Sequence, residues 1–273
     1  MFPTSSQVKF WMFADDKEIL CLRKEANERF IKEHGKQEFF LTTAEERSLQ
    51  RHYEYILKEF CARFQPPMPR AVVGCSMAYF KRVYIHNSLM DYHPREMMLT
   101  CVYLACKVEE FNVSINQFVA NLKGDRERFA DLIVSCELML MHHLHYHLTM
   151  HSPYRPFEGL MIDMKTRCKS ITDVEKIRKG ADDFMDRSLN TDAMLLFSPS
   201  QVSRLFAVGF CTEGGKGTEN KEIDPSLGNL STMIIMQVTN NNNNSLLYYT
   251  LYHKIWTDAN LVCNYIAILF AGC

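Results

Sequence analysis

The chain has 273 residues, of which 47% are hydrophobic, so it is long enough for two modest domains or one large one, each with a buried core. Its 31 Lys and Arg residues nearly balance its 32 Asp and Glu residues, which gives a formal net charge of -1. No global field therefore draws the protein to nucleic acid or to an anionic membrane, and no run of basic residues is longer than three.

The first region, residues 1–42, is expected to be a helix followed by a connector. Residues 14–34 are mostly charged but carry an apolar stripe at helical spacing. The stripe consists of Ile19, Leu22, Ala26 and Phe30. Such a helix faces solvent on one side and lies on another part of the protein with the other.

A second helix is predicted to start at a capping box, Thr43-Ala-Glu-Glu46, whose hydroxyl and carboxylate satisfy backbone N–H groups of the first turn. Apolar residues then recur every three or four positions, at Leu49, Tyr53, Ile56, Phe60 and Phe64. The prolines of Pro66-Pro-Met-Pro69 end this helix.

Four more helices are predicted with short connections, over residues 70–85, 95–110, 114–122 and 126–144. In the first, five apolar residues lie on or near one stripe: Val72, Val73, Met77, Phe80 and Tyr84. The body of the second, from Met97 to Cys106, carries no charge, and a helix that is apolar all round must be surrounded by others. We therefore expect 95–110 to be the hub of a bundle. No alternating strand pattern interrupts these segments, so residues 43–150 are predicted to form one all-α domain.

A second helical region is predicted over residues 151–230. It begins with a proline-rich linker and is expected to hold helices near 156–168, 173–190 and 199–210. Fewer helices are predicted here than in the first domain, which indicates that the second domain is incomplete.

Residues 231–273 are predicted to be an atypical tail, for which a core helix, a strand and sequence outside any folded unit all stay open. The segment holds an asparagine run and only two formal charges, Lys254 and Asp258. Its apolar stretch 261–271 is too short to span a bilayer, which needs about twenty residues.

Ten cysteines are spread singly along the chain without C-x-x-C spacing, and residues 1–9 lack the apolar stretch of a secretory signal. This pattern predicts reduced intracellular thiols, most of them small core residues. It does not favour a cysteine-based metal site.

Two single charges stand beside long apolar runs. Lys107 follows the uncharged segment of the predicted hub, and Glu137 interrupts the run from Leu132 to Met141. A lone charge buried in such a helix would cost several kcal/mol, so each needs a partner, solvent or a ligand. One interpretation is local pairing, for which Glu110 stands three residues after Lys107. The other is an exposed apolar interface with a Lys–Glu pair at its centre.

Histidines between residues 142 and 151 suggest a metal site at first sight. His142 and His145 are spaced to share a helix face, which can supply two zinc ligands. No third ligand and no H-E-x-x-H spacing accompany them. The sequence therefore favours solvated or packed histidines over a metal centre or an enzyme.

Four segments, in chain order, resemble the conserved segments of a cyclin box. They are Met68-Pro-Arg-Ala-Val-Val73, Tyr79-Phe-Lys-Arg82, Leu104-Ala-Cys-Lys-Val-Glu-Glu110 and Glu137-Leu-Met-Leu140. The resemblance implies an all-α fold of tandem five-helix bundles, the second incomplete because the residues after 230 are unlike the family. In cyclins, the lysine of the K-V-E-E segment and the glutamate of the fifth helix contact the kinase helix that carries the catalytic glutamate.

On this sequence the resemblance assigns those two roles to Lys107 and Glu137. The exposed parts of the same two helices are expected to contribute Glu110 and Met141 to the kinase-binding surface.

Further segments are similar to the cyclin H branch of the family. They are Ser5-Ser-Gln with Trp11, Tyr92-His-Pro-Arg95, and His151-Ser-Pro-Tyr-Arg-Pro-Phe-Glu-Gly159 with Asp163 and Lys165. A cyclin C-like transcriptional cyclin shares the K-V-E-E segment and stays an alternative. So does a cyclin-fold general transcription adaptor that binds DNA, although the near-neutral charge argues against it.

The cyclin H resemblance implies a non-catalytic regulatory subunit without cofactor or metal. Its expected partners are a cyclin-dependent kinase catalytic subunit, the assembly factor of the CDK-activating kinase, and transcription factor IIH. It implies a nuclear location, and neither nucleic acid nor membrane is expected as a direct partner.

Overall fold

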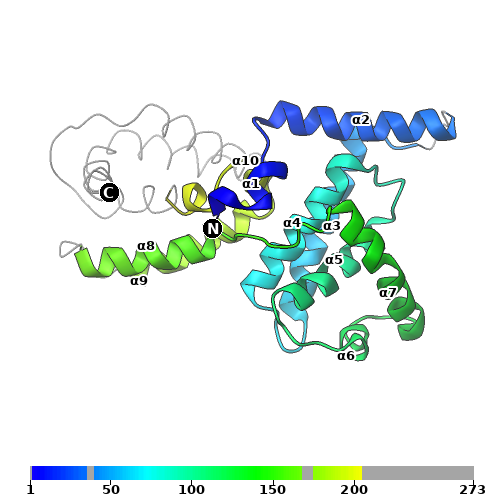
Figure 1. The fold of residues 1–273 in the computed structure, drawn as a ribbon. Coiled ribbons are helices and arrows are strands. Elements are labelled where there is room, and N and C mark those ends of the chain that lie inside the picture. Colours follow the sequence, from blue (N-terminus) through cyan, green and yellow to red (C-terminus); the bar gives the residue numbers. More distant parts are fainter. Residues whose placement is uncertain (1, 36–39, 168–174, 205–273) are drawn as a thin grey trace. The chain divides into compact units, whose positions relative to one another are not determined.

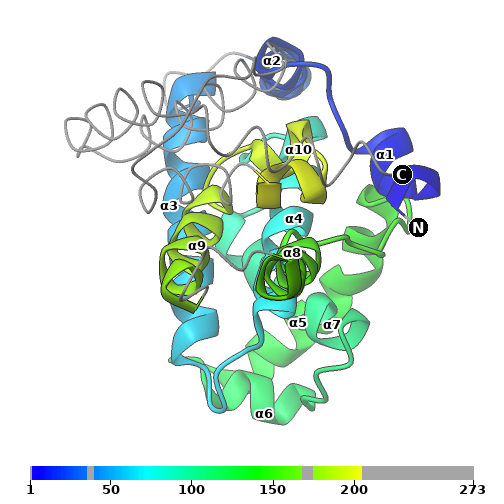
Figure 2. The same cartoon turned by 90° about the vertical axis from the view of Figure 1, so that its left-hand side faces the viewer.

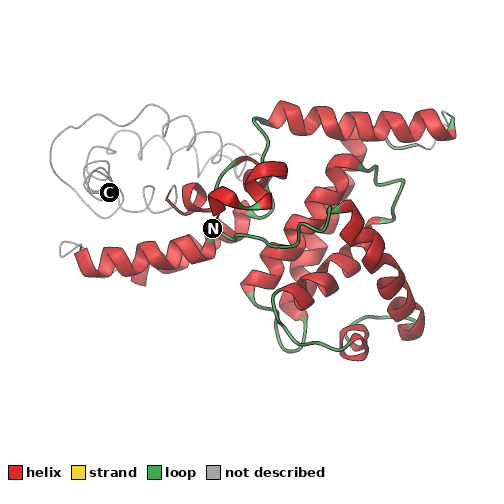
Figure 3. Cartoon of the chain, in the orientation of Figure 1, coloured by secondary structure: helices red, strands yellow, loops and turns green. Residues whose placement is uncertain are grey.

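The computed structural model describes residues 2–35, 40–167 and 175–204. All the regular elements of these ranges are helices, and no strand occurs in them (Figure 3). The predicted all-α fold class is therefore confirmed. The chain divides into two compact units, residues 1–152 and 153–273.

Two predictions fall wholly or partly outside the described residues. They are the atypical tail over 231–273 and the part of the second domain between 205 and 230. The predicted domain boundaries stay a prediction.

The helices of the first unit follow one another with short connections (Figure 1). After a 3-10 turn, η1 (Phe2–Thr4), they are α1 (Ser6–Phe10), α2 (Asp16–His34), α3 (Thr43–Arg63), α4 (Arg70–His86), α5 (Pro94–Val108), α6 (Ile115–Ala120) and α7 (Arg126–His143). The six helices predicted between residues 14 and 144 are confirmed, with ends that differ by at most two residues. The elements η1 and α1 were not predicted, because segments this short show no helical period.

The N-terminal segment packs through Trp11, whose side chain is 1% exposed. The indole Nε1–H donates to His147 Nδ1 over 3.1 Å, and the Arg82 guanidinium lies 4.8 Å from the ring centroid. The rings of His86 and His145 lie nearby, with centroids 6.3 and 6.0 Å from that of the indole. Burial lowers the pKa of His147, which favours the neutral imidazole that this hydrogen bond requires.

Helix α2 begins at Asp15, whose carboxylate accepts the backbone N–H of Glu18 over 2.8 Å. Its predicted apolar stripe faces inward, since Ile19 and Ala26 are buried and the helix packs on α4 and α3. The expectation of a helix lying on the rest of the domain is confirmed.

The predicted capping box of α3 is wrong by one residue. Thr42 is the cap, because its hydroxyl accepts the Glu45 N–H over 3.4 Å and the Glu45 carboxylate accepts the Thr42 N–H over 2.8 Å. Thr43 is instead the first helical residue, and Glu46 points into the protein. There the Glu46 carboxylate accepts hydrogen bonds from the Ser88 hydroxyl and from the backbone N–H of Leu89. Burial raises the pKa of this carboxyl.

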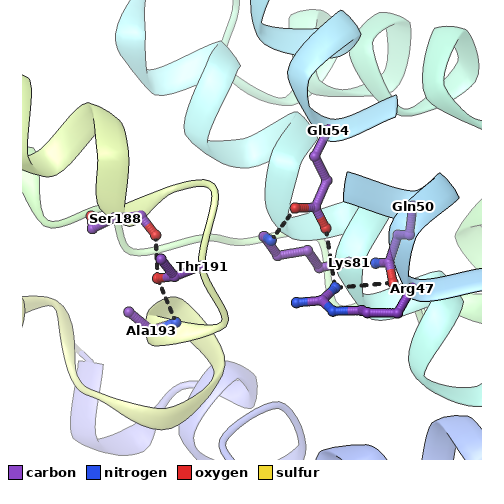
Figure 4. A network of polar contacts seen from close by, with 7 residues as sticks. All are labelled: Arg47, Gln50, Glu54, Lys81, Ser188, Thr191 and Ala193. Carbon is purple, nitrogen blue, oxygen red and sulfur yellow. Dashed lines mark hydrogen bonds and ion pairs between the residues drawn. The ribbon is translucent and has the colours of Figure 1, made fainter. Parts of the chain in front are cut away.

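Helix α4 is buried on all sides between residues 74 and 85, so the burial extends beyond the predicted stripe, of which Val72, Met77, Phe80 and Tyr84 are buried. Lys81 is 0% exposed and its Nζ lies 2.8 Å from Oε2 of Glu54, which is 1% exposed. Figure 4 shows this pair with Arg47, which lies 3.6 Å from the other carboxylate oxygen and donates to Gln50. Two buried charges are tolerated here because each lies against an opposite charge.

Helix α5 is the predicted hub, and this is confirmed. It packs against α3, α4 and α7, and Figures 1 and 2 show these helices around it. His93 caps its start and Pro94 stands in its first turn, where proline costs no hydrogen bond. All its residues from Met97 to Cys106 are buried, as the absence of charge predicts.

The described part of the second unit holds α8 (Tyr154–Arg167), α9 (Glu175–Ser188) and α10 (Ala193–Leu196), followed by helical residues 199–204. The helices predicted near 156–168 and 173–190 are confirmed, and that predicted over 199–210 is described as far as residue 204. The short α10 was not predicted.

Polar contacts hold α8, α9 and α10 together. The Tyr154 hydroxyl donates to Asp186 over 2.8 Å, and Arg178 donates to both carboxylate oxygens of Glu158 over 2.5 and 3.0 Å. In the turn after α9, the Thr191 hydroxyl donates to the Ser188 carbonyl and accepts the N–H of Ala193 (Figure 4). No helix among the described residues has both the length and the apolar character that crossing a membrane requires.

Candidate functional site

The predicted site residues lie on two helices that pack side by side. Lys107 is in the last turn of α5, and Glu137 and Met141 lie on successive turns of α7. Asp125 caps α7 by accepting the backbone N–H of Arg128. Helix α5, capped by His93, packs on α7, capped by Asp125, and this packing brings together Lys107 and Glu137, which are 30 residues apart in the chain.

Lys107 and Glu137 form a close ion pair. The lysine Nζ donates to both carboxylate oxygens, over 2.6 Å to Oε1 and 2.8 Å to Oε2. The Lys107 side chain is 47% exposed and that of Glu137 is 15% exposed. Neither charge is buried alone, and a pair exposed to this degree contributes only about 0–1 kcal/mol to stability.

Glu110 does not provide the local partner that its spacing suggests. It lies beyond the end of α5 with φ 56°, and its carboxylate is exposed to solvent. The lysine ammonium turns to α7 instead, so the interpretation of local pairing on α5 is wrong. Met141 is half-buried, one helical turn after Glu137.

The exposed apolar interface expected around the Lys–Glu pair includes two residues of α7 that were not singled out from the sequence. Val134 is 56% exposed and Leu138 is 63% exposed, and both lie beside Glu137. Together with Met141 they recur at spacings of four and three residues, so the three side chains line one face of the helix. We refer to Val134, Leu138 and Met141 as the α7 stripe.

The signal for this stripe was present in the sequence but ambiguous. The run from Leu132 to Met141 is apolar on every side, and of its residues only Ile133 and Leu140 are fully buried. Large exposed apolar residues gathered on one face mark a surface that binds another molecule. The charged pair lies beside this face.

The histidines do not share a helix face. Helix α7 ends at His143, and His145 follows with φ 50°, which turns its ring onto Trp11. His142 is exposed near the helix end. The i,i+3 geometry on which a two-histidine metal site depends is therefore absent from this pair.

Two cysteines of α5 are core thiols, whereas Cys136, next to Glu137 on α7, is only partly buried. Cys101 and Cys106 on α5 are fully buried. Burial raises the pKa of the Cys106 thiol to about 12, so it stays protonated at neutral pH and is a poor nucleophile or metal ligand. The exposed apolar side chains and the ion pair together offer a binding surface.

Comparison with known proteins finds two family models on this chain. The model of the cyclin N-terminal domain matches residues 21–149, and that of the cyclin C-terminal domain matches residues 152–214. Cyclin-H of Xenopus laevis is 42% identical over 230 residues, which are 81% of this chain and 71% of the relative.

Two solved structures have the same fold at lower identity. A chain of the CAK complex of Chaetomium thermophilum bound to ATP-gamma-S is 22% identical with a TM-score of 0.69, and the match covers 94% of this chain and 77% of that one. A chain of the yeast TFIIK (Kin28/Ccl1/Tfb3) complex is 21% identical with a TM-score of 0.65, covering 94% and 99% of the two chains.

Proposed function

Because this chain belongs to the cyclin family, and within it to the cyclin H branch, we propose that it is a regulatory subunit that binds and activates a cyclin-dependent kinase. The chain performs no chemistry itself, and the kinase supplies the catalytic site. Lys107, Glu110, Glu137 and Met141 are its proposed kinase-binding residues, together with the remainder of the α7 stripe.

The observation that carries this proposal is an ion pair beside exposed apolar side chains. Lys107 Nζ lies 2.6 Å from Glu137 Oε1, and Leu138 next to it is 63% exposed. Such a pair contributes little to the stability of the fold. Exposed apolar side chains give no hydrophobic stabilisation until another molecule removes them from water. Both features are explained if a partner covers the stripe and uses the pair to fix its orientation.

The proposed mechanism is selection of the active kinase conformation. In protein kinases the αC glutamate must pair with the strand lysine that holds the ATP phosphates. A cyclin that binds better to the kinase with its αC helix turned inward shifts the population to that state. The cyclin changes activity only by this difference in affinity between the two states.

The proposed partners follow from the relatives. We assign to this chain a place in a CDK-activating kinase complex, with the kinase and its assembly factor, and through that complex in transcription factor IIH. A nuclear location is proposed for the same reason, since a subunit of transcription factor IIH acts where transcription takes place.

The test exchanges the two charges. In a variant with Lys107→Glu and Glu137→Lys, the internal pair is kept with opposite polarity, so the helical fold should remain intact. The charges offered to the kinase are reversed, and like-charge contacts cost several kcal/mol. We expect affinity for the kinase to fall by roughly 30-fold or more, with loss of co-purification and of kinase activation.

A matched control exchanges the surface pair Lys24 and Glu28 on α2, whose side chains are 65% and 61% exposed. This exchange should leave kinase binding and activation unchanged. If the exchange at Lys107 and Glu137 also leaves activation unchanged while circular dichroism shows a native fold, this surface does not bind the kinase.

A further inference from the structure

Lys107 has a second contact besides Glu137. Its Nζ lies 4.8 Å from the ring centroid of Tyr103, which is one turn earlier on the same helix. This distance is within the range in which an ammonium is attracted to the face of an aromatic ring. The ammonium is thus held by a carboxylate of α7 and by a ring of α5.

The Tyr103 ring is itself held by the core. Its side chain is 7% exposed, and its ring centroid lies 5.3 Å from that of Phe118 on α6. Phe118 is 0% exposed and contacts Phe60 and Phe64 at centroid distances of 5.5 and 5.8 Å. Tyr103 therefore ends a chain of packed rings that runs from α3 through α6 to the surface charge on α5.

Such a support matters because lysine is flexible. A free lysine side chain carries large rotamer entropy that binding must remove. Glu137 alone orders it weakly, because exposed ion pairs are weak and are screened by salt. A ring face beneath the ammonium limits its positions even when the carboxylate turns toward a partner.

We propose that Tyr103 is a positioning residue that holds Lys107 in its binding geometry before the kinase arrives, a role that rests on the proposed function. Pre-ordering the lysine reduces the loss of freedom on binding and so increases affinity. The ring face is the part of the side chain that acts, so phenylalanine should serve as well as tyrosine.

The test measures kinase affinity of the full chain carrying Tyr103→Leu or Tyr103→Phe, each alone and with Lys107→Met. We expect the leucine variant to bind about threefold more weakly and the phenylalanine variant to bind like the wild type. In the Lys107→Met background the leucine change should have no further effect, because the group that the ring positions is gone.

A core variant separates positioning from loss of stability. Phe60→Leu removes packing from the same chain of rings without touching Lys107, and it should leave affinity unchanged while lowering the melting temperature. The positioning role is overturned if Tyr103→Leu weakens binding equally with and without Lys107, or no more than Phe60→Leu does.

A second measurement needs no kinase. In NMR spectra of the chain labelled at lysine, the ring current should move the Lys107 methylene protons upfield, and this shift should vanish in Tyr103→Leu and persist in Tyr103→Phe. Absence of the shift in the wild type overturns the positioning role. If the shift is present but Lys107→Met leaves kinase binding unchanged, the proposed kinase surface is wrong and the role in binding falls with it. If Lys107→Met weakens binding and Tyr103→Leu does not, only the positioning role is wrong.

Discussion

Replacement of Lys81 by methionine should destabilise the first unit strongly. The change removes the ammonium that lies 2.8 Å from Glu54, while the Glu54 carboxylate stays 1% exposed. Breaking a buried ion pair on one side costs about 3–5 kcal/mol, because the remaining charge is left uncompensated. Arg47 stays 3.6 Å from the other carboxylate oxygen, so we expect the lower end, about 3 kcal/mol.

The paired variant Lys81→Met with Glu54→Leu should recover most of this loss, because it leaves no charge without a partner. For a unit of 152 residues, 1 kcal/mol corresponds to about 2–4 °C, so the single variant should melt about 6–12 °C lower. Urea unfolding followed by circular dichroism gives the free energy of unfolding, and a thermal scan gives the melting temperature.

The exposed lysine Lys24 provides the control, since Lys24→Met should change the free energy of unfolding by less than about 0.5 kcal/mol. A loss below about 1 kcal/mol for Lys81→Met, or a paired variant less stable than the single one, would refute this account of the buried pair.

Three further outcomes are expected. Thr42→Ala should lower the free energy of unfolding by about 1 kcal/mol, measured in urea, because the Glu45 N–H loses its cap; an unchanged value would contradict the cap assignment. Because burial lowers the pKa of His147, its contact with Trp11 should be complete above pH 6.5 and lost as the pH falls through that lowered pKa. Indole fluorescence in a chain without the other tryptophan reports this loss of contact. In the His147→Asn variant, whose side chain keeps an acceptor but does not titrate, the fluorescence change with pH should disappear. Leu138→Asp should abolish kinase co-purification without lowering the melting temperature, since this side chain is 63% exposed; retained binding would exclude the α7 stripe from the interface.

The sequence determined helices α2 to α7 of the first unit because their apolar residues recur with the helical period and their ends carry caps or prolines. The charge-free body of α5 predicted its central place for the same reason, since nothing on that helix can face water. Lys107 and Glu137 stood out as single charges in apolar surroundings. The motifs of the cyclin box gave the family.

Tertiary structure decided which of two equivalent capping boxes starts α3. Thr42 with Glu45 and Thr43 with Glu46 are equally good capping boxes in sequence, and the choice was made by Ser88, 42 residues away, which binds Glu46. A capping box involves only residues close in sequence. The hydrogen bond of the Glu46 carboxylate to Ser88 joins residues far apart in the chain, so only the fold provides it.

The same holds for the charges. The buried Lys81 has Arg82 beside it and looks like part of a solvated face, and only the packing of α4 on α3 brings it to Glu54. The sequence offered Lys107 two carboxylates, Glu110 nearby and Glu137 thirty residues away, and the packing of α5 on α7 decides for Glu137. A sequence shows which side chains carry charge and which helix faces are apolar. Contacts between residues distant in the chain depend on how the helices pack, because burial is a property of all the neighbours together.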